Sequence, residues 1–185
     1  KEDQLKLNIS SHYLDRHHDA DINLEEENFN PFRCHHGVIQ IRVKDNGSGM
    51  PADMIKKVCD PFYTSRTTRK VGLGIPLLKM NAEQAQGHFS ITSEVGAGTS
   101  IKAVFKHKNV DRPAIGDIAG ILTMLATTDP KIDVVYIHTN QSNDYIFDTR
   151  EIKKELDDIP LTNPEVMRFI KEMVKENLES INYTK

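Results

Sequence analysis

The sequence predicts an α/β fold, a two-layer sandwich in which a mixed β-sheet is covered by helices on one face, with an appended α/β unit. A strand pattern with a period of two spans residues 37–44, and helical patterns follow over 51–58 and 72–87. Two more strands are expected over 88–93 and 100–106. Strand, helix, helix and hairpin in this order are typical of a sheet packed against helices.

Residues typical of strand ends and helix ends support the bounds of the expected elements. The first strand has Val38, Ile39, Ile41 and Val43 as its apolar positions and ends directly at Asp45. Pro51 suits the first turn of the short helix, and Gly87 suits the end of the longer one. Residues 63–70 are rich in Thr, Ser and Arg without an apolar period, so we expect a mobile loop there.

A second unit is expected to begin at residue 109. Its predicted elements are helices over 115–127, 149–157 and 163–181 and strands over 133–139 and 145–147. The expected domains are therefore 1–108 and 109–185. Residues 1–36 are polar and divergent, and we assign no element to them.

The composition excludes several classes of protein. The 185 residues carry a formal net charge of −3 and no long basic run, which disfavours nucleic acid as the main partner. The longest apolar run, 114–126, is interrupted by Gly and Asp and cannot cross a bilayer. Cys34 and Cys59 lie far apart in the sequence and fit reduced intracellular thiols better than a disulfide framework. The N-terminal residues lack an apolar signal core. We therefore expect a cytoplasmic protein.

Three glycine turns lie at element boundaries. They read Asp45-Asn46-Gly47-Ser48-Gly49-Met50, Gly72-Leu73-Gly74 and Gly96-Ala97-Gly98-Thr99. A carboxylate can accept a hydrogen bond from a base edge, and glycine lets the main chain approach phosphates closely. Together these turns indicate a nucleotide. The simpler alternative for Asp45 alone is a turn cap, since Asp-Asn-Gly is ordinary turn chemistry.

With Asp60-Pro61-Phe62 between them, these turns resemble, in order and spacing, the boxes of the histidine-kinase-like ATPases (the GHKL superfamily). This superfamily includes DNA gyrase B, the ninety-kilodalton heat-shock chaperones, sensor histidine kinases and MutL. The resemblance runs from about Gly37 to Phe105, and residues 60–76 are similar to bacterial stand-alone ATP-binding proteins with a kinase-type ATPase domain. It implies a Bergerat-type fold and ATP as the ligand of domain 1–108.

The resemblance implies a role for each matching residue. Asp45 would accept a hydrogen bond from the adenine amino group, and a water and Thr99 would complete the contacts to the base. The second glycine turn would present main-chain N–H groups to the phosphates, and residues 63–71 would form a lid. The expected nucleotide-binding residues are Asp45, Gly47, Gly49, Met50, Arg66, Lys70, Gly72, Leu73, Gly74 and Thr99. No catalytic residue is assigned.

The resemblance also implies a helix before the first glycine turn, with an Asn that holds Mg²⁺. After Asp15 the chain reads Arg16-His17-His18-Asp19, and the nearest asparagines are Asn23, Asn28 and Asn30, none in a clean amphipathic helix. Mg²⁺ is therefore expected with ATP, but the sequence identifies no ligand for it and we assign no metal-binding residue.

The histidines of residues 1–36 allow two further readings. His17, His18, His35 and His36 could bind zinc with Cys34, but their spacing fits no standard Cys/His pattern. His12 faintly resembles the phosphoacceptor of sensor kinases. Only 32 residues separate it from Asp45, too few for a helical dimerisation hairpin and the expected helix. We disfavour both.

Two functions follow, and a third is weaker. The first is an ATP-binding domain of a kinase or ATPase in bacterial regulation, which performs phosphoryl transfer by positioning and charge. The alternative is a nucleotide-sensing or scaffold module that binds ATP or ADP without turnover, so enzymatic activity stays open. The weakest is an interaction domain that has lost its ligand. Beyond the nucleotide, residues 109–185 could contact a protein partner or form a homodimer.

Overall fold

The computed structural model describes residues 3–12, 37–61, 72–140 and 143–182. The described residues form six strands and five helices, with both parallel and antiparallel strand pairs. They cluster into two compact units, which we call the glycine-box unit (Ser11–Pro113) and the β5 unit (Lys1–Ser10 with Ala114–Lys185). The predicted α/β class with mixed strand pairing is confirmed.

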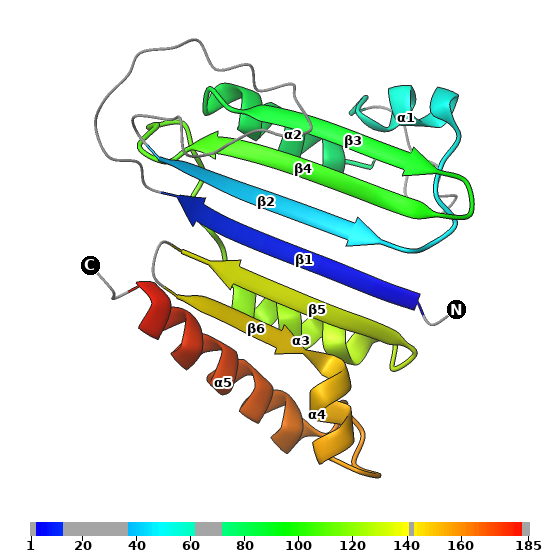
Figure 1. Cartoon of the computed structure of the whole chain (residues 1–185), viewed down its shortest axis with the longest axis vertical. Coiled ribbons are helices and arrows are strands. Elements are labelled where there is room, and N and C mark those ends of the chain that lie inside the picture. The colour runs from blue at the N-terminus through cyan, green and yellow to red at the C-terminus, as the bar shows by residue number, and fades with distance from the viewer. Residues whose placement is uncertain (1–2, 13–36, 62–71, 141–142, 183–185) are drawn as a thin grey trace. The chain divides into compact units, whose positions relative to one another are not determined.

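The glycine-box unit contains three antiparallel strands with β4 in the middle. Strand β4 (Gly98–Lys106) pairs with β2 (Val38–Asp45) on one side and with β3 (His88–Glu94) on the other. Two helices, α1 (Ala52–Val58) and α2 (Gly74–Gln84), connect β2 to β3. Figure 1 shows α2 lying behind β3 and β4. The predicted order of strand, two helices and hairpin is confirmed.

Helix α2 packs on one face of these strands. Ile41, Ala103 and Phe89 lie directly opposite one another across β2, β4 and β3 and therefore share that face. The core consists of Ala82, Ala85, Ala103 and Phe105, with Ile41, Leu78 and Phe89 packed against it. The small alanine side chains let the helix approach the sheet closely. Because Phe105 is buried, truncating it to alanine would cost roughly 3–5 kcal/mol.

The end of α2 differs slightly from the prediction. The helix ends at Gln84 rather than Gly87, because Gln86 adopts a left-handed conformation with φ of 54°. A Cβ on Gly87 would lie 1.7 Å from the carbonyl oxygen of Val104. Gly87 is thus required by the close approach of this turn to β4, not by the last helical turn.

The β5 unit is built around strand β5 (Ile132–Thr139). Strand β1 (Asp3–His12) runs parallel to β5, and β6 (Asp144–Asp148) runs antiparallel to it (Figure 1). Its helices are α3 (Ile118–Thr128), α4 (Thr149–Glu155) and α5 (Pro164–Asn182). All of them lie within a few residues of the predicted bounds. Helix α3 begins later than predicted because the Asp117 side chain accepts a hydrogen bond from Gly120 N and caps it there.

Strand β1 is the element that the sequence did not predict. Leu5 and Leu7 are half-buried while Lys6 is exposed, which is the alternation of a strand with one covered face. Leu5 lies opposite Val134, and Leu7 lies opposite Tyr136. Residues 13–36, which hold most of the histidine cluster and the nearest asparagines, lie outside the described residues.

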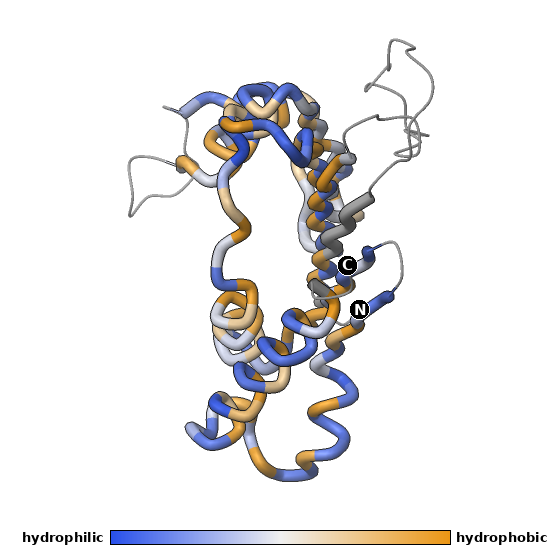
Figure 2. Tube along the Cα trace, turned by 90° about the vertical axis from the view of Figure 1, so that its left-hand side faces the viewer, coloured by the Kyte–Doolittle hydropathy of each residue, from blue (hydrophilic) through white to orange (hydrophobic). Residues whose placement is uncertain are grey.

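Helices α3 and α5 of the β5 unit each bury one stripe of side chains. In α5 the buried positions are Val166, Ile170, Val174 and Ile181, which recur at helical spacing. Helix α5 packs against α3, whose Leu122 and Ala126 are buried. Figure 2 shows that hydrophobic and hydrophilic residues alternate along the helical parts of the trace. No helix in the described ranges combines the length and the apolar character needed to cross a membrane.

Candidate functional site

Three polar residues lie side by side at one end of the sheet face that α2 covers in the glycine-box unit. Asp45, at the end of β2, lies opposite Thr99 on β4, and Thr99 in turn lies opposite Ser93 on β3. We call these residues the polar row. Directly opposed residues share a face and have Cβ atoms about 4.5–5.5 Å apart. The row continues the apolar face of Ile41 and Ala103, so it lies at the boundary between core and solvent.

Asp45 keeps hydrogen-bonding capacity after forming its turn. Its Oδ1 accepts a hydrogen bond of 2.9 Å from Gly47 N. This contact forms an Asx turn, so Asp45 does have the turn-capping role that was the simpler alternative. An ionised carboxylate can accept about four hydrogen bonds. From the described part of the chain Asp45 receives only this one, and its side chain can still accept a donor from a ligand.

The first and last glycine turns pack directly on each other. Gly49 has φ of +65°, and a Cβ there would lie 1.9 Å from the Glu94 carbonyl oxygen. Gly98 has φ of +107°, and a Cβ there would lie 2.1 Å from the Asp45 carbonyl oxygen. Both positions therefore require glycine. The amide of Gly96 also donates to the carbonyl of Ser48 at 2.8 Å.

Ser93 connects these two turns and is absent from the residues predicted from the sequence. Its Oγ accepts a hydrogen bond from Met50 N at 2.8 Å and donates to the Gly98 carbonyl at 2.9 Å. It also lies 3.0 Å from Thr99 Oγ1. The described structure thus brings together Asp45, Gly47, Gly49, Met50 and Thr99, with Ser93 at the centre of their contacts.

The second glycine turn lies at the start of α2. Leu73 occupies the N-cap position without a side-chain hydrogen bond to the helix, and it is 47% exposed. A Cβ on Gly74 would meet nothing within 4 Å. The first N–H groups of a helix lack partners within the helix and carry its positive dipole end. This end of α2 can therefore receive an anion.

The predicted lid, residues 63–71, lies outside the described residues. Arg66 and Lys70 lie outside the described residues, as does Phe62 of the Pro-Phe box. Within the described residues, no three histidine, cysteine or carboxylate side chains gather closely enough to hold a metal ion.

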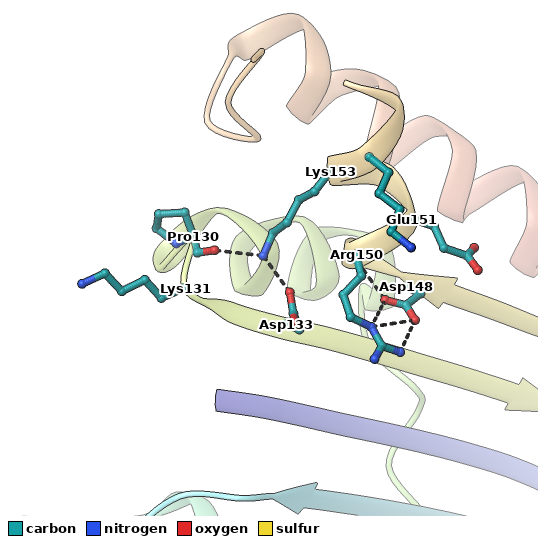
Figure 3. A pocket seen from close by; sticks show the side chains of 8 residues that line it. Pro130, Lys131, Asp133, Asp148, Arg150, Glu151 and Lys153 are labelled. Carbon is teal, nitrogen blue, oxygen red and sulfur yellow. Dashed lines mark hydrogen bonds and ion pairs between the residues drawn. The ribbon is translucent and has the colours of Figure 1, made fainter. Parts of the chain in front are cut away.

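A cavity of about 740 Å³ lies elsewhere, in the β5 unit, beside α4 (Figure 3). It is lined by Pro130, Lys131, Asp133, Asp148, Arg150, Glu151, Lys153 and Lys154. Lys153 Nζ contacts Asp133 Oδ1 at 2.8 Å and also donates to the Pro130 carbonyl. The two-pronged hydrogen bond from Arg150 lowers the pKa of Asp148, which also caps α4. The carboxylates of Asp133, which is buried, and Asp148, which is half-buried, are thus already paired, and the cavity resembles a structural ion-pair site.

Comparison with known proteins identifies the family. A family model described as "Histidine kinase-, DNA gyrase B-, and HSP90-like ATPase" matches residues 4–109, more than half of the chain. The chain therefore belongs to this family, whose members bind adenine nucleotides. The matched region includes the whole polar row and all three glycine turns.

The curated relatives described here are named as kinases, and this chain spans 11 to 22% of their length. The sensor kinase CckA of Brucella abortus is 30% identical over 108 residues, which cover 49% of this chain and 11% of the relative. Sporulation kinase C of Bacillus subtilis is 35% identical over 37% of this chain and 16% of its own length. Sensor histidine kinase YxdK of the same species is 36% identical over 37% of this chain and 22% of its own.

Proposed function

We propose that this chain binds ATP at the polar row of the glycine-box unit. The observation that carries the proposal is Asp45, a half-buried carboxylate with spare acceptor capacity, beside Thr99 at the end of the helix-covered face. An adenine amino group is a hydrogen-bond donor and suits such an acceptor. Gly47, Gly49 and Met50 form the turn around Asp45 and would line the base pocket. Membership of the family supports adenine as the base.

The phosphates would lie toward the N-terminus of α2. Gly72, Leu73 and Gly74 supply main-chain N–H groups at a helix end that favours anions. We propose that Arg66 and Lys70 add positive charge to the same phosphates. Mg²⁺ is expected with ATP in this family, and it would neutralise phosphate charge there. We name no side chain for it.

We propose a role as the nucleotide-binding part of a kinase or ATPase in bacterial regulation, acting in the cytoplasm. The relatives named as sensor or sporulation kinases support this role, although the chain spans only 11 to 22% of the length of the three described above. Residues 109–185 would contact a protein partner or a second copy. The second candidate is binding of ATP or ADP without turnover, kept because the sequence identifies no Asn for Mg²⁺.

Isothermal titration calorimetry with ATP tests the binding site. Replacing Asp45 with Asn keeps an oxygen for Gly47 N but removes the charge. The affinity for ATP should therefore fall by about 10- to 100-fold, which corresponds to the free energy of a hydrogen bond to a charged group. Asp53→Asn, on the exposed side of α1, is the matched control and should bind as the wild type does. Equal affinity of both variants would remove Asp45 from the site, and absence of ATP binding in the wild type would reject the proposal.

Phosphate release with ATP and Mg²⁺ separates the two candidates. Turnover above the level of the Asp45→Asn variant supports the kinase or ATPase. Binding with no release above that level, and no phosphoryl transfer to an added partner, supports the sensing module instead.

A further inference from the structure

The face of β2, β3 and β4 that α2 does not cover carries positive charge. Alternate residues of a strand lie on opposite faces, so Arg42 and Lys44 lie on the face opposite to Ile41, which belongs to the core under α2. Arg42 lies directly opposite Lys102 on β4. Figure 1 shows α2 behind these strands, with the other face turned toward the viewer. We call Arg42, Lys44 and Lys102 the basic patch.

The charges of Arg42 and Lys44 are not balanced by the described residues. Both residues are exposed, and neither forms an ion pair with an acidic side chain of the described ranges. Among the paired positions of this face in β2, β3 and β4, the only acidic residue is Glu94, at the end of β3, and β4 lies between it and β2. Arg42 and Lys44 can therefore bind an anionic group from outside these strands.

The basic patch does not serve the stability of the sheet. Like charges directly opposite each other in a strand pair are destabilising, and Arg42 and Lys102 are in this position. Burial, and after it the charge of Arg42, lowers the pKa of Lys102. An anion bound beside these side chains would offset their repulsion. The arrangement indicates that the positive charge has a role other than folding.

The size of the basic patch limits the kind of partner. Proteins that bind DNA tightly make about 6–10 phosphate contacts, and clusters that bind anionic lipid contain about 4–8 Lys or Arg residues. The patch has fewer cations than either. The whole chain has a formal net charge of −3, which disfavours a long polyanion. A short acidic segment of a protein matches the patch better.

The spacing along β2 suits an extended peptide. Arg42 and Lys44 are two residues apart on one face, and alternate residues of a strand lie roughly 6.8 Å apart. Carboxylates at alternate positions of an extended peptide have the same spacing. The guanidinium group of Arg42 can hold one carboxylate through two parallel hydrogen bonds, and the ammonium group of Lys44 is a point charge for the next. The hydroxyl group of Ser100, directly opposite Lys44, is a further donor on this face.

We propose that the basic patch docks an acidic, extended segment of a protein partner, with one carboxylate on Arg42 and the next alternate carboxylate on Lys44. The inference goes beyond the nucleotide site and does not depend on it, because Asp45 and Thr99 lie on the face that α2 covers. It assigns a partner surface to the glycine-box unit itself.

Fluorescence anisotropy with the labelled peptide Ser-Glu-Ser-Glu-Ser-Glu-Ser tests the proposal on the full chain. At low ionic strength, where exposed ion pairs are least screened, the wild type should bind the peptide saturably. Arg42→Gln combined with Lys44→Gln should lower the affinity about tenfold, because two ion pairs are lost. Lys56→Gln combined with Lys57→Gln removes the same charge from exposed positions of α1 and should bind as the wild type does.

A second peptide tests the geometry. Glu-Ser-Ser-Glu-Ser-Ser-Glu has the same composition, but its neighbouring carboxylates lie on opposite sides of an extended chain, so it should bind more weakly. The variant Arg42→Gln, Lys44→Gln should remain folded, as judged by urea denaturation, because it removes the repulsion between Arg42 and Lys102. Its affinity for ATP should equal that of the wild type.

Several results would overturn the proposal. These are no saturable binding to the wild type, equal binding to the wild type and the Arg42→Gln, Lys44→Gln variant, or equal binding of the two peptides. Tighter binding of an oligothymidylate or of anionic phospholipid vesicles would assign the basic patch to nucleic acid or to a membrane instead. Peptide binding that needs Glu25, Glu26 and Glu27 replaced with Gln would assign it to this chain's own acidic residues. Peptide binding without ATP binding would reject only the proposed function.

Discussion

The polar row and the cavity beside α4 both contain partly or largely buried carboxylates, but they use them differently. Asp45 accepts one hydrogen bond from the described residues, from the amide of Gly47 two positions away. In the cavity, the side chains of Asp133 and Asp148 are 12% and 11% exposed and are paired with Lys153 and Arg150 (Figure 3). The first arrangement leaves capacity for a ligand, whereas the second satisfies its charges within the fold.

On the proposal that ATP binds at the polar row, neither cavity size nor the number of charged side chains marks the binding site of this chain. The cavity has a substantial volume and many charged side chains, yet its buried acidic groups already have cationic partners. The polar row has one charged residue, and backbone contacts between two glycine turns define its geometry. The ATP-binding proposal depends instead on the unused acceptor capacity of Asp45 beside two closely packed glycine turns.

The largest expected effect comes from disrupting the backbone contact that defines the polar row. Gly98→Ala would place a Cβ 2.1 Å from the Asp45 carbonyl oxygen at a φ of +107°. We expect the free energy of unfolding to fall by about 3 kcal/mol, measured by urea denaturation. Gly96→Ala is the control, because Gly96 also has a positive φ but its Cβ would meet nothing within 4 Å. Equal losses would show that the contact between the turns is unimportant.

A smaller effect is expected from the ion pair of the cavity. Lys153→Met leaves Asp133, itself buried, without its cation. Removing one partner of a fully buried pair costs about 3–5 kcal/mol, and because the Lys153 side chain is 30% exposed we expect about 2 kcal/mol. Lys154 lines the same cavity but is exposed and is not the partner of Asp133, so Lys154→Met should be nearly neutral. ATP affinity should be unchanged in both. A large loss of affinity in either would place the ligand in the cavity.

The smallest expected effect is a dependence of stability on pH in the β5 unit. His138 is buried, its Nδ1 lies 2.8 Å from the Tyr136 hydroxyl, and burial lowers its pKa below the ordinary 6.5. The folded state then binds fewer protons than the unfolded state, so stability is complete above about pH 7 and falls as the pH drops below about 6.5.

Between about pH 7 and 5.5 the loss should be about 1 kcal/mol or less, measured by denaturation at each pH. His138→Gln should flatten this slope. A slope that persists unchanged in the variant would assign the pH dependence to other groups.

Most of the fold could be predicted from the sequence because its signals are local. The alternation that ends at Asp45, the proline at the start of α1 and the apolar stripe of α5 each lie within one element. Strand β1 was missed although Leu5 and Leu7 alternate with Lys6. Its partner is β5, more than 120 residues further along the chain, and parallel pairing at such a distance leaves no local mark.

The candidate site could be predicted only in part. The glycine turns were found because positive φ angles and close backbone approach restrict the residue type, as at Gly49 and Gly98. Ser93 could not be found in this way, since a single serine in a strand has no distinctive pattern. Its importance arises from the register with Thr99 and from Met50, 43 residues earlier in the chain.

Amide chemical-shift mapping with ATP tests the central claim most directly. In nuclear magnetic resonance spectra of the full chain, ATP should shift the amides of residues 47–50, 72–74 and 99, around the polar row and the start of α2. The amide chemical shifts of residues that line the cavity, including Lys131, Arg150 and Lys154, should not change. Shifts confined to the cavity, with the glycine turns unchanged, would contradict the assignment of the nucleotide to the polar row.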